Sequence, residues 1–181
     1  MRTIACFDCT GDENAAFLVY HLAWMYADLG LSVVAADLGP RARLSRMFLD
    51  DDRLEAFWEG GERLLSVHGA FQPLLGGQAD LLPAHREAVS PGLVLLVGDP
   101  GLSSAEDEFS REWTRCLEGE PSTFQGIGGL RRILSSAAEG VEADVVLIDP
   151  GPTPSALQRA ALVAAQDVVL TVAPDLFSIQ G

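Results

Sequence analysis

Two cysteines stand three residues apart near the start of the chain, in the segment Cys6-Phe7-Asp8-Cys9. A C-x-x-C pair at a junction between a strand and a helix can support redox or metal chemistry, because a helix N-terminus stabilises a thiolate. In the alternative interpretation, Cys6 is a small core residue of the first strand and Cys9 fills the loop after it. No second C-x-x-C is present to complete a zinc site.

The basic side chains of the chain are all arginines. The sequence has twelve basic residues, none of them lysine, against 26 acidic residues, which gives a formal net charge of -14. Nucleic acids and anionic lipids are bound mainly through Lys and Arg, so this charge disfavours both as partners. Lysine is also the usual phosphate ligand in P-loop enzymes, so a chain without lysine lacks this ligand for binding a nucleotide.

The length of 181 residues predicts one domain, residues 1–181, with a sizeable core. Apolar residues make up 48% of the chain and charged residues 21%, which is a globular balance. No apolar run reaches the ~18 residues that a membrane span needs. The N-terminus leads into a strand pattern without a signal-peptide cleavage site. We therefore expect a cytoplasmic protein.

Strand and helix patterns alternate along the chain, which predicts an α/β fold: a mainly parallel sheet flanked by helices on both faces. The predicted strands cover residues 2–8, 31–37, 93–97, 145–148 and 168–172. The predicted helices cover residues 14–29, 103–117, 129–138 and 156–165, with pieces of helix over 41–75. In the first helix the larger apolar residues form the expected buried stripe: Phe17, Leu18, Leu22, Trp24, Met25 and Leu29. A capping box is predicted from Ser103 to Glu106, and Ser155 is expected to cap the last helix.

Several segments, taken in order, resemble the ParA/MinD-type deviant P-loop ATPases, which include the plasmid and chromosome partition proteins. The segments that carry the resemblance are residues 22–30 (LAWMYADLG), 36–40 (ADLGP), 96–124, 143–152 (ADVVLIDPGP), 159–165 (RAALVAA) and 172–178 (VAPDLFS). They are spread from residue 22 to residue 178, so the resemblance extends over nearly the whole chain. The resemblance implies a P-loop NTPase-like fold from which the C-terminal part of the family's domain is absent.

The family's phosphate loop, K-G-G-x-G-K-T-T, is degenerate in this sequence. By resemblance it maps onto Thr10, Gly11, Asp12, Glu13, Asn14, Ala15, Ala16 and Phe17, and only Gly11 matches the pattern. Ala15 stands where a lysine would contact the β- and γ-phosphates, and Ala16 stands where a hydroxyl would bind Mg²⁺. Asp12 and Glu13 place carboxylates where backbone N–H groups would surround the anion.

The family's D-x-D-P motif also departs from its pattern, since it reads Asp37-Leu38-Gly39-Pro40 and lacks the second aspartate. Two acids remain by resemblance: Asp37, and Asp149 at the Walker B position. They are either relics of a metal site or acids at strand ends that accept backbone hydrogen bonds.

The resemblance and the losses together predict a ParA-like pseudo-ATPase that does not hydrolyse ATP and acts as a protein-interaction or regulatory module. The expected partner is a protein, either a second copy of the chain or an active ParA-like homologue. No cofactor is expected. ATP and Mg²⁺ would be cofactors only if the degenerate site still binds nucleotide. In that first alternative, weak ATP binding, Arg41 is the nearest substitute for the lysine. A thiol redox or metal module that uses Cys6 and Cys9 is the second alternative.

Overall fold

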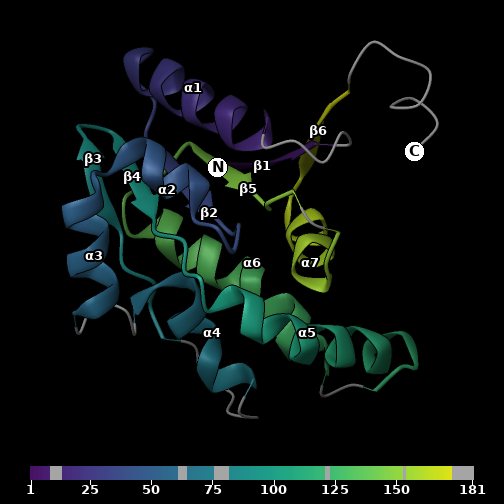
Figure 1. Ribbon diagram of the computed structural model, residues 1–181. Coiled ribbons are helices and arrows are strands. Elements are labelled where there is room, and N and C mark those ends of the chain that lie inside the picture. Colours follow the sequence, from purple (N-terminus) through teal and green to yellow (C-terminus); the bar gives the residue numbers. More distant parts are fainter. Residues whose placement is uncertain (9–13, 61–64, 76–81, 121–122, 153, 173–181) are drawn as a thin grey trace.

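The computed structural model describes residues 1–8, 14–60, 65–75, 82–120, 123–152 and 154–172 (Figure 1). In this part of the chain a six-stranded sheet has the order β3-β4-β2-β5-β1-β6. The parallel strands are β1 (Arg2–Asp8), β2 (Val33–Asp37), β4 (Leu93–Leu96), β5 (Val145–Asp149) and β6 (Asp167–Thr171). The predicted α/β fold with a mainly parallel sheet is confirmed.

Helices cover both faces of the sheet (Figure 1). One face packs against α1 (Asn14–Asp28), α2 (Arg43–Phe48) and α3 (Asp51–Glu59), and the other packs against α4 (Val67–Leu75), α5 (Leu102–Leu117), α6 (Thr123–Glu139) and α7 (Ala156–Ala164). β2 and β5 are buried on both faces, as strands of a covered parallel sheet should be. None of the helices in the described residues is both long enough and apolar enough to span a bilayer.

The strand β3 (Glu87–Ser90) was not predicted from the sequence. It pairs antiparallel with β4 across a turn that contains Gly92, whose φ of 77° suits glycine. The strand β3 is short, and its four residues are partly polar and only half-buried. It therefore lacks the apolar run that identifies the inner strands.

The predicted buried stripe of α1 is only partly confirmed, because Leu18, Leu22 and Trp24 are partly buried against the core whereas the other three residues are exposed. The fully buried positions are small residues: Ala15, Ala16, Val19 and Ala23. Phe17 is 54% exposed, Met25 45% and Leu29 70%. Small side chains let the helix axis approach the sheet closely, and the periodicity of apolar residues alone does not distinguish this face from a second, exposed apolar face.

The predicted capping box of α5 is also wrong. The helix begins at Leu102, and its N-cap, Gly101, makes no side-chain cap hydrogen bond. Glu106 instead accepts hydrogen bonds from the backbone N–H groups of Ala156 (2.6 Å) and Leu157 (3.3 Å), at the start of α7. Ser155 caps α7 as predicted, by accepting from the N–H of Gln158. Glu106 therefore joins two helices that are 50 residues apart in the sequence.

We predict that Glu106→Ala lowers the free energy of unfolding by about 1–2 kcal/mol, because two N–H groups at the start of α7 lose their acceptor. Urea unfolding followed by circular dichroism measures this change. Asp107→Ala is the matched control, since Asp107 is an exposed neighbour on the same helix, and it should change stability by no more than about 0.5 kcal/mol. Equal effects of the two substitutions would contradict the cross-helix cap.

Candidate functional site

Three aspartates end neighbouring strands at the carboxyl edge of the sheet. Asp8 is the last residue of β1, Asp37 of β2 and Asp149 of β5, and each is at most 3% exposed. Because side chains alternate along a strand, the three acids lie on the face that α1 and α2 cover. The carboxyl edge of a parallel sheet is where α/β proteins bind ligands, so these acids mark the candidate site.

Protein donors occupy both oxygens of Asp37. Its Oδ2 accepts from the backbone N–H and the hydroxyl of Ser45, both at 2.7 Å, and its Oδ1 accepts from the N–H of Gly39 at 3.0 Å. Burial raises the pKa of Asp37 to about 6, although the Ser45 and Gly39 donors act to lower it. The carboxylate therefore joins the end of β2 to α2 and to the loop between them.

The hydroxyl of Ser45 extends this connection to β4. Ser45 Oγ accepts from the N–H of Gly98 at 2.9 Å. A Cβ atom on Gly98 would lie 2.8 Å from Asp37 Cγ, closer than side-chain carbons approach, so glycine is required at this position. We call Asp37, Ser45, Gly39 and Gly98 the Asp37 latch.

The other two acids hold loops that follow strands. Asp149 Oδ1 accepts from the N–H of Gly151 at 3.1 Å, and Asp8 Oδ2 accepts from the N–H of Asn14 at 3.2 Å. Gly151 has φ 78°, and a Cβ there would lie 3.0 Å from the Cα of Gly39. The loops after β2 and β5 therefore pack directly against each other over the sheet edge.

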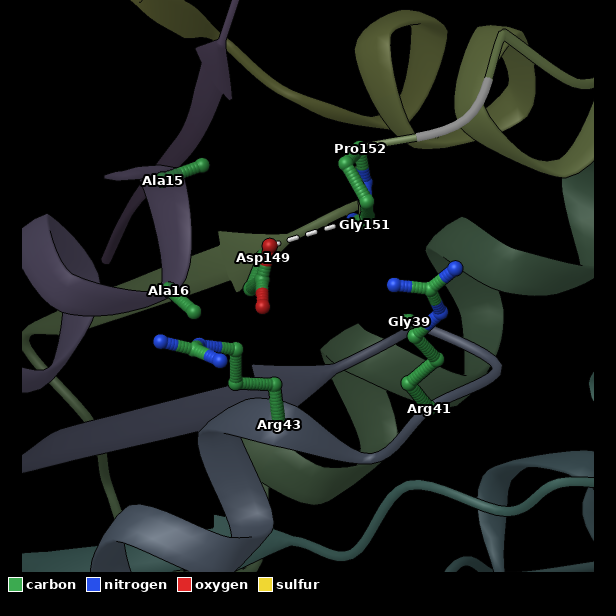
Figure 2. A pocket seen from close by; sticks show the side chains of 8 residues that line it. All are labelled: Ala15, Ala16, Gly39, Arg41, Arg43, Asp149, Gly151 and Pro152. Atoms are coloured by element: carbon green, nitrogen blue, oxygen red, sulfur yellow. Dashed lines mark hydrogen bonds between the residues drawn. The ribbon is translucent and has the colours of Figure 1, made fainter. Parts of the chain in front are cut away.

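A small cavity lies between α1 and these loops (Figure 2). Its volume is about 10 Å³, which is about the space that one water molecule needs. The cavity is lined by Ala15, Ala16, Gly39, Arg41, Arg43, Asp149, Gly151 and Pro152. In Figure 2 the guanidinium of Arg43 points toward Ala16, and that of Arg41 lies nearer to Gly151. The cationic groups around the cavity thus come from the segment after β2.

The structure brings together some of the residues assigned by resemblance. Ala15 and Ala16 line the cavity with Asp149, but Asp37 is turned into its own hydrogen bonds with Ser45 and Gly39. Asn14 and Phe17 are exposed and are not among the residues that line the cavity. Gly11, Asp12, Glu13 and Cys9 lie outside the described residues.

Sequence reasoning missed three residues of the site: Asp8, Arg43 and Ser45. Asp8 could have been found as an acid at a strand end, like Asp37. Arg43 and Ser45 belong to a helix of six residues, and no local pattern connects that helix to the sheet edge.

Cys6 is a free and fully buried thiol. Burial, together with the nearby negative charge of Asp149, raises its pKa to about 11. The thiolate form is therefore scarce at neutral pH, which argues against redox or metal chemistry at Cys6. No group of three or more His, Cys, Asp or Glu side chains in the described part of the chain is arranged to hold a metal ion.

Two curated proteins align with the whole chain. It is 28% identical over 181 residues to "Protein IncC" of Escherichia coli, and 26% identical over 187 residues to the "Putative replication protein A" of Rhizobium rhizogenes. The chain spans only 43% and 42% of the lengths of these two relatives. No protein-family model matches the chain.

Solved structures share the fold. The protein DIP2308 of Corynebacterium diphtheriae superposes with a TM-score of 0.88 at 24% identity, over 99% of this chain and 63% of that one. Cobyrinic acid a,c-diamide synthase of Mycobacterium smegmatis, solved with an ATP analogue and magnesium, gives a TM-score of 0.68 at 26% identity, over 94% of this chain and 57% of that one. A plasmid partition protein of Borrelia burgdorferi gives 0.69 at 12% identity, over 99% of this chain and 69% of that one.

The parallel sheet with helices on both faces, and a site at its carboxyl edge after β1, define a P-loop NTPase-like domain. Within that class the chain is similar to a replication protein and to IncC and shares its fold with a plasmid partition protein, and the resemblance to the ParA/MinD-type ATPases found in its sequence is confirmed.

The Asp37 latch predicts a specific pH dependence. The pKa of Asp37 is about 6 in the folded chain and its ordinary value is 3.8. The folded state therefore binds more protons between these values, and the free energy of unfolding falls as the pH rises through that window. Relative to Asp37→Asn, which cannot titrate, the wild type should lose about 1 kcal/mol between pH 5 and pH 7.5.

Urea unfolding of both proteins across this pH range measures the difference. Asp144→Asn is the control, because Asp144 is an exposed aspartate and its substitution should leave the wild-type pH profile unchanged between pH 5 and pH 7.5. A constant difference between wild type and Asp37→Asn would contradict a raised pKa at Asp37.

Proposed function

We propose that this chain is a ParA-like domain that neither binds nor hydrolyses ATP in the family's manner, and that it acts as a protein-interaction or regulatory module. The observation that carries the proposal is the small cavity at the start of α1. Ala15 and Ala16 line it in place of a lysine and a hydroxyl, so α1 supplies no side-chain donor to a phosphate group at these positions.

Charge supports the same conclusion. Asp12 and Glu13 place two acids at positions where, by resemblance, the family's phosphate loop has a glycine and a variable residue. Each charge-assisted contact is worth roughly 1.5–3 kcal/mol. Loss of two lysines and a metal-binding hydroxyl would remove about 5–8 kcal/mol if the contributions added. Since a micromolar site amounts to only about 8 kcal/mol, little affinity remains.

The two acids that match the family's motifs, Asp37 and Asp149, also have structural roles. Asp37 accepts three hydrogen bonds from Ser45 and Gly39, and Asp149 holds the turn at Gly151. A magnesium ion would have to displace these donors from the carboxylates. This supports the interpretation of both residues as structural acids at strand ends.

An interaction role is supported by the outer face of α1. Phe17, Met25 and Leu29 are large, apolar and 45–70% exposed, and His21 packs its ring 4.7 Å from that of Phe17. Large apolar residues that gather on one exposed face commonly mark a protein interface. The partner we propose is a ParA-like protein: a second copy of this chain or an active homologue.

Weak ATP binding remains the second candidate, because two arginines reach the cavity. Arg43 and Arg41 both line it, and Figure 2 shows Arg43 directed toward Ala16. A solved relative holds an ATP analogue and magnesium. In this candidate the arginines would replace the lysine, and binding would require the cavity to widen.

Calorimetric titration with ATP, with and without magnesium, separates the two candidates. We predict no magnesium-dependent binding up to millimolar nucleotide and no release of phosphate, because the chain lacks the ligands that share Mg²⁺ with the nucleotide. A ParA-type ATPase with an intact phosphate loop serves as the positive control. Micromolar binding that requires magnesium would contradict the pseudo-ATPase proposal.

The proposed interface gives a further prediction. Phe17→Ser should weaken self-association, or association with the ParA-type ATPase of the same genome, by about 10-fold or more, because an exposed aromatic anchor is lost. Sedimentation velocity measures both associations. The matched control is Val163→Ser, since Val163 is 63% exposed on α7, on the opposite side of the sheet. The proposed interface on α1 would be contradicted if Phe17→Ser associated as the wild type does, or if the wild type bound neither protein.

A further inference from the structure

We propose that a cavity between α6 and the segment before β3 binds a small carboxylate that has an apolar body. The cavity has a volume of about 210 Å³ and is lined by Leu82, Pro83, Ala84, Arg132, Ile133 and Ser136. Four of these six residues are apolar, and the other two supply a guanidinium and a hydroxyl. The inference goes beyond the proposed function and does not rest on it, because the site shares no residue with the small cavity or with the outer face of α1.

Helix α6 places the two polar side chains of the cavity on one face. Arg132 and Ser136 are exposed and four residues apart, so they are neighbours on the surface of the helix. Ile133 is 2% exposed and adds an apolar wall next to them. A ligand whose charged end contacts Arg132 can therefore also contact the hydroxyl of Ser136 and an apolar surface.

The guanidinium of Arg132 is available to a ligand. None of the described residues forms an ion pair, a hydrogen bond or a ring contact with its side chain. The hydroxyl of Ser136 likewise makes no hydrogen bond within the part of the chain that the structure describes. The site differs in this respect from the carboxyl edge of the sheet, where Arg41 and Arg43 already have partners.

The wall opposite α6 is fixed by contacts of the chain before β3. The backbone N–H of His85 donates a 2.6 Å hydrogen bond to the carbonyl of Leu65. A Cβ atom on Gly140 would collide with the guanidinium of Arg86, so Arg86 lies directly against the backbone just after α6. Ala84 is buried in the core that α6 helps to form. The cavity is thus organised by packed residues before any ligand arrives.

Local charge favours an anion although the whole chain is acidic. α6 carries two arginines, Arg131 and Arg132, and one acid, Glu139. Glu139 follows Arg132 by seven residues, which is ~10 Å along the helix axis. Charges are screened over ~8 Å at physiological ionic strength. The guanidinium beside the cavity therefore acts on a ligand more strongly than the more distant acids that give the chain its net charge of -14.

A carboxylate fits the polar groups of this cavity better than a phosphate does. One planar guanidinium offers paired N–H donors that match the two oxygens of a carboxylate. A phosphate group carries up to about two negative charges, whereas Arg132 is the one cationic side chain among the described residues that line the cavity. The volume lies below the ~300–1,000 Å³ of drug-sized sites, so the apolar body is a chain of a few carbons or a single ring.

The test is an NMR titration of the isotope-labelled protein with hexanoate, and with hexanol as its uncharged counterpart. We expect saturable shifts of the amide signals of Ala84, Ile133 and Ser136, and about 10-fold weaker binding of hexanol because it lacks the charge that pairs with Arg132. Arg132→Gln should weaken the binding of hexanoate about 10-fold and leave that of hexanol unchanged. The matched control is Arg131→Gln, since Arg131 is an exposed neighbour that does not line the cavity, and it should bind like the wild type.

Ser136→Phe is a second variant, which fills part of the cavity from an exposed helical position and should abolish the shifts at Ala84 and Ile133. Thermal unfolding confirms that each variant is folded. Three results would overturn the proposal: no saturable shifts at tens of millimolar hexanoate, hexanol bound as tightly as hexanoate, or hexanoate binding that Arg132→Gln and Ser136→Phe both leave unchanged. Each of these results leaves the proposed function unaffected, because neither ATP binding nor the interface on α1 involves this cavity.

Discussion

The carboxylate of Asp37 organises the edge of the sheet at which the site lies. It is fully buried, and it accepts hydrogen bonds from Gly39 and from both the backbone and the hydroxyl of Ser45. Since Ser45 also accepts from Gly98, one side chain connects β2, α2 and the end of β4. Arg43 of α2 lines the small cavity, so the position of this arginine depends on the latch.

The latch also explains how the buried carboxylate of Asp37 is accommodated at this edge of the sheet. A buried carboxylate is costly unless donors or cations compensate it. Here backbone N–H groups serve all three acids, and a serine hydroxyl and nearby arginines assist. The edge therefore has its own internal partners for charge. A nucleotide with its metal would have to replace those partners.

Much of the fold could be predicted because its signals are local. The inner strands are continuous apolar runs, and the helices show apolar periodicity and terminal glycines such as Gly30. Predictions that depended on which surface a side chain meets were less successful. Periodicity located α1 but assigned Phe17, Met25 and Leu29 to the buried face, although they are exposed and small residues such as Ala15 and Ala23 are buried there. Glu106 has the spacing of a local cap, yet its carboxylate reaches a helix that is distant in sequence.

The same difference between local signals and contacts that form only in the folded chain applies to the candidate site. Its motif positions, such as Ala15 and Asp149, could be assigned from ordered sequence similarity. The partners of Asp37 could not, because residues 37, 45 and 98 meet only after the sheet forms.

Amide-resolved NMR with Mg-ATP tests the central claim most directly, because it reports where a nucleotide binds as well as whether it binds. The account predicts that the signals of Ala15, Ala16 and Gly151 stay unchanged at millimolar nucleotide. Saturable, magnesium-dependent shifts at Ala15 and Ala16 would show that the phosphate site still works, and would contradict the account.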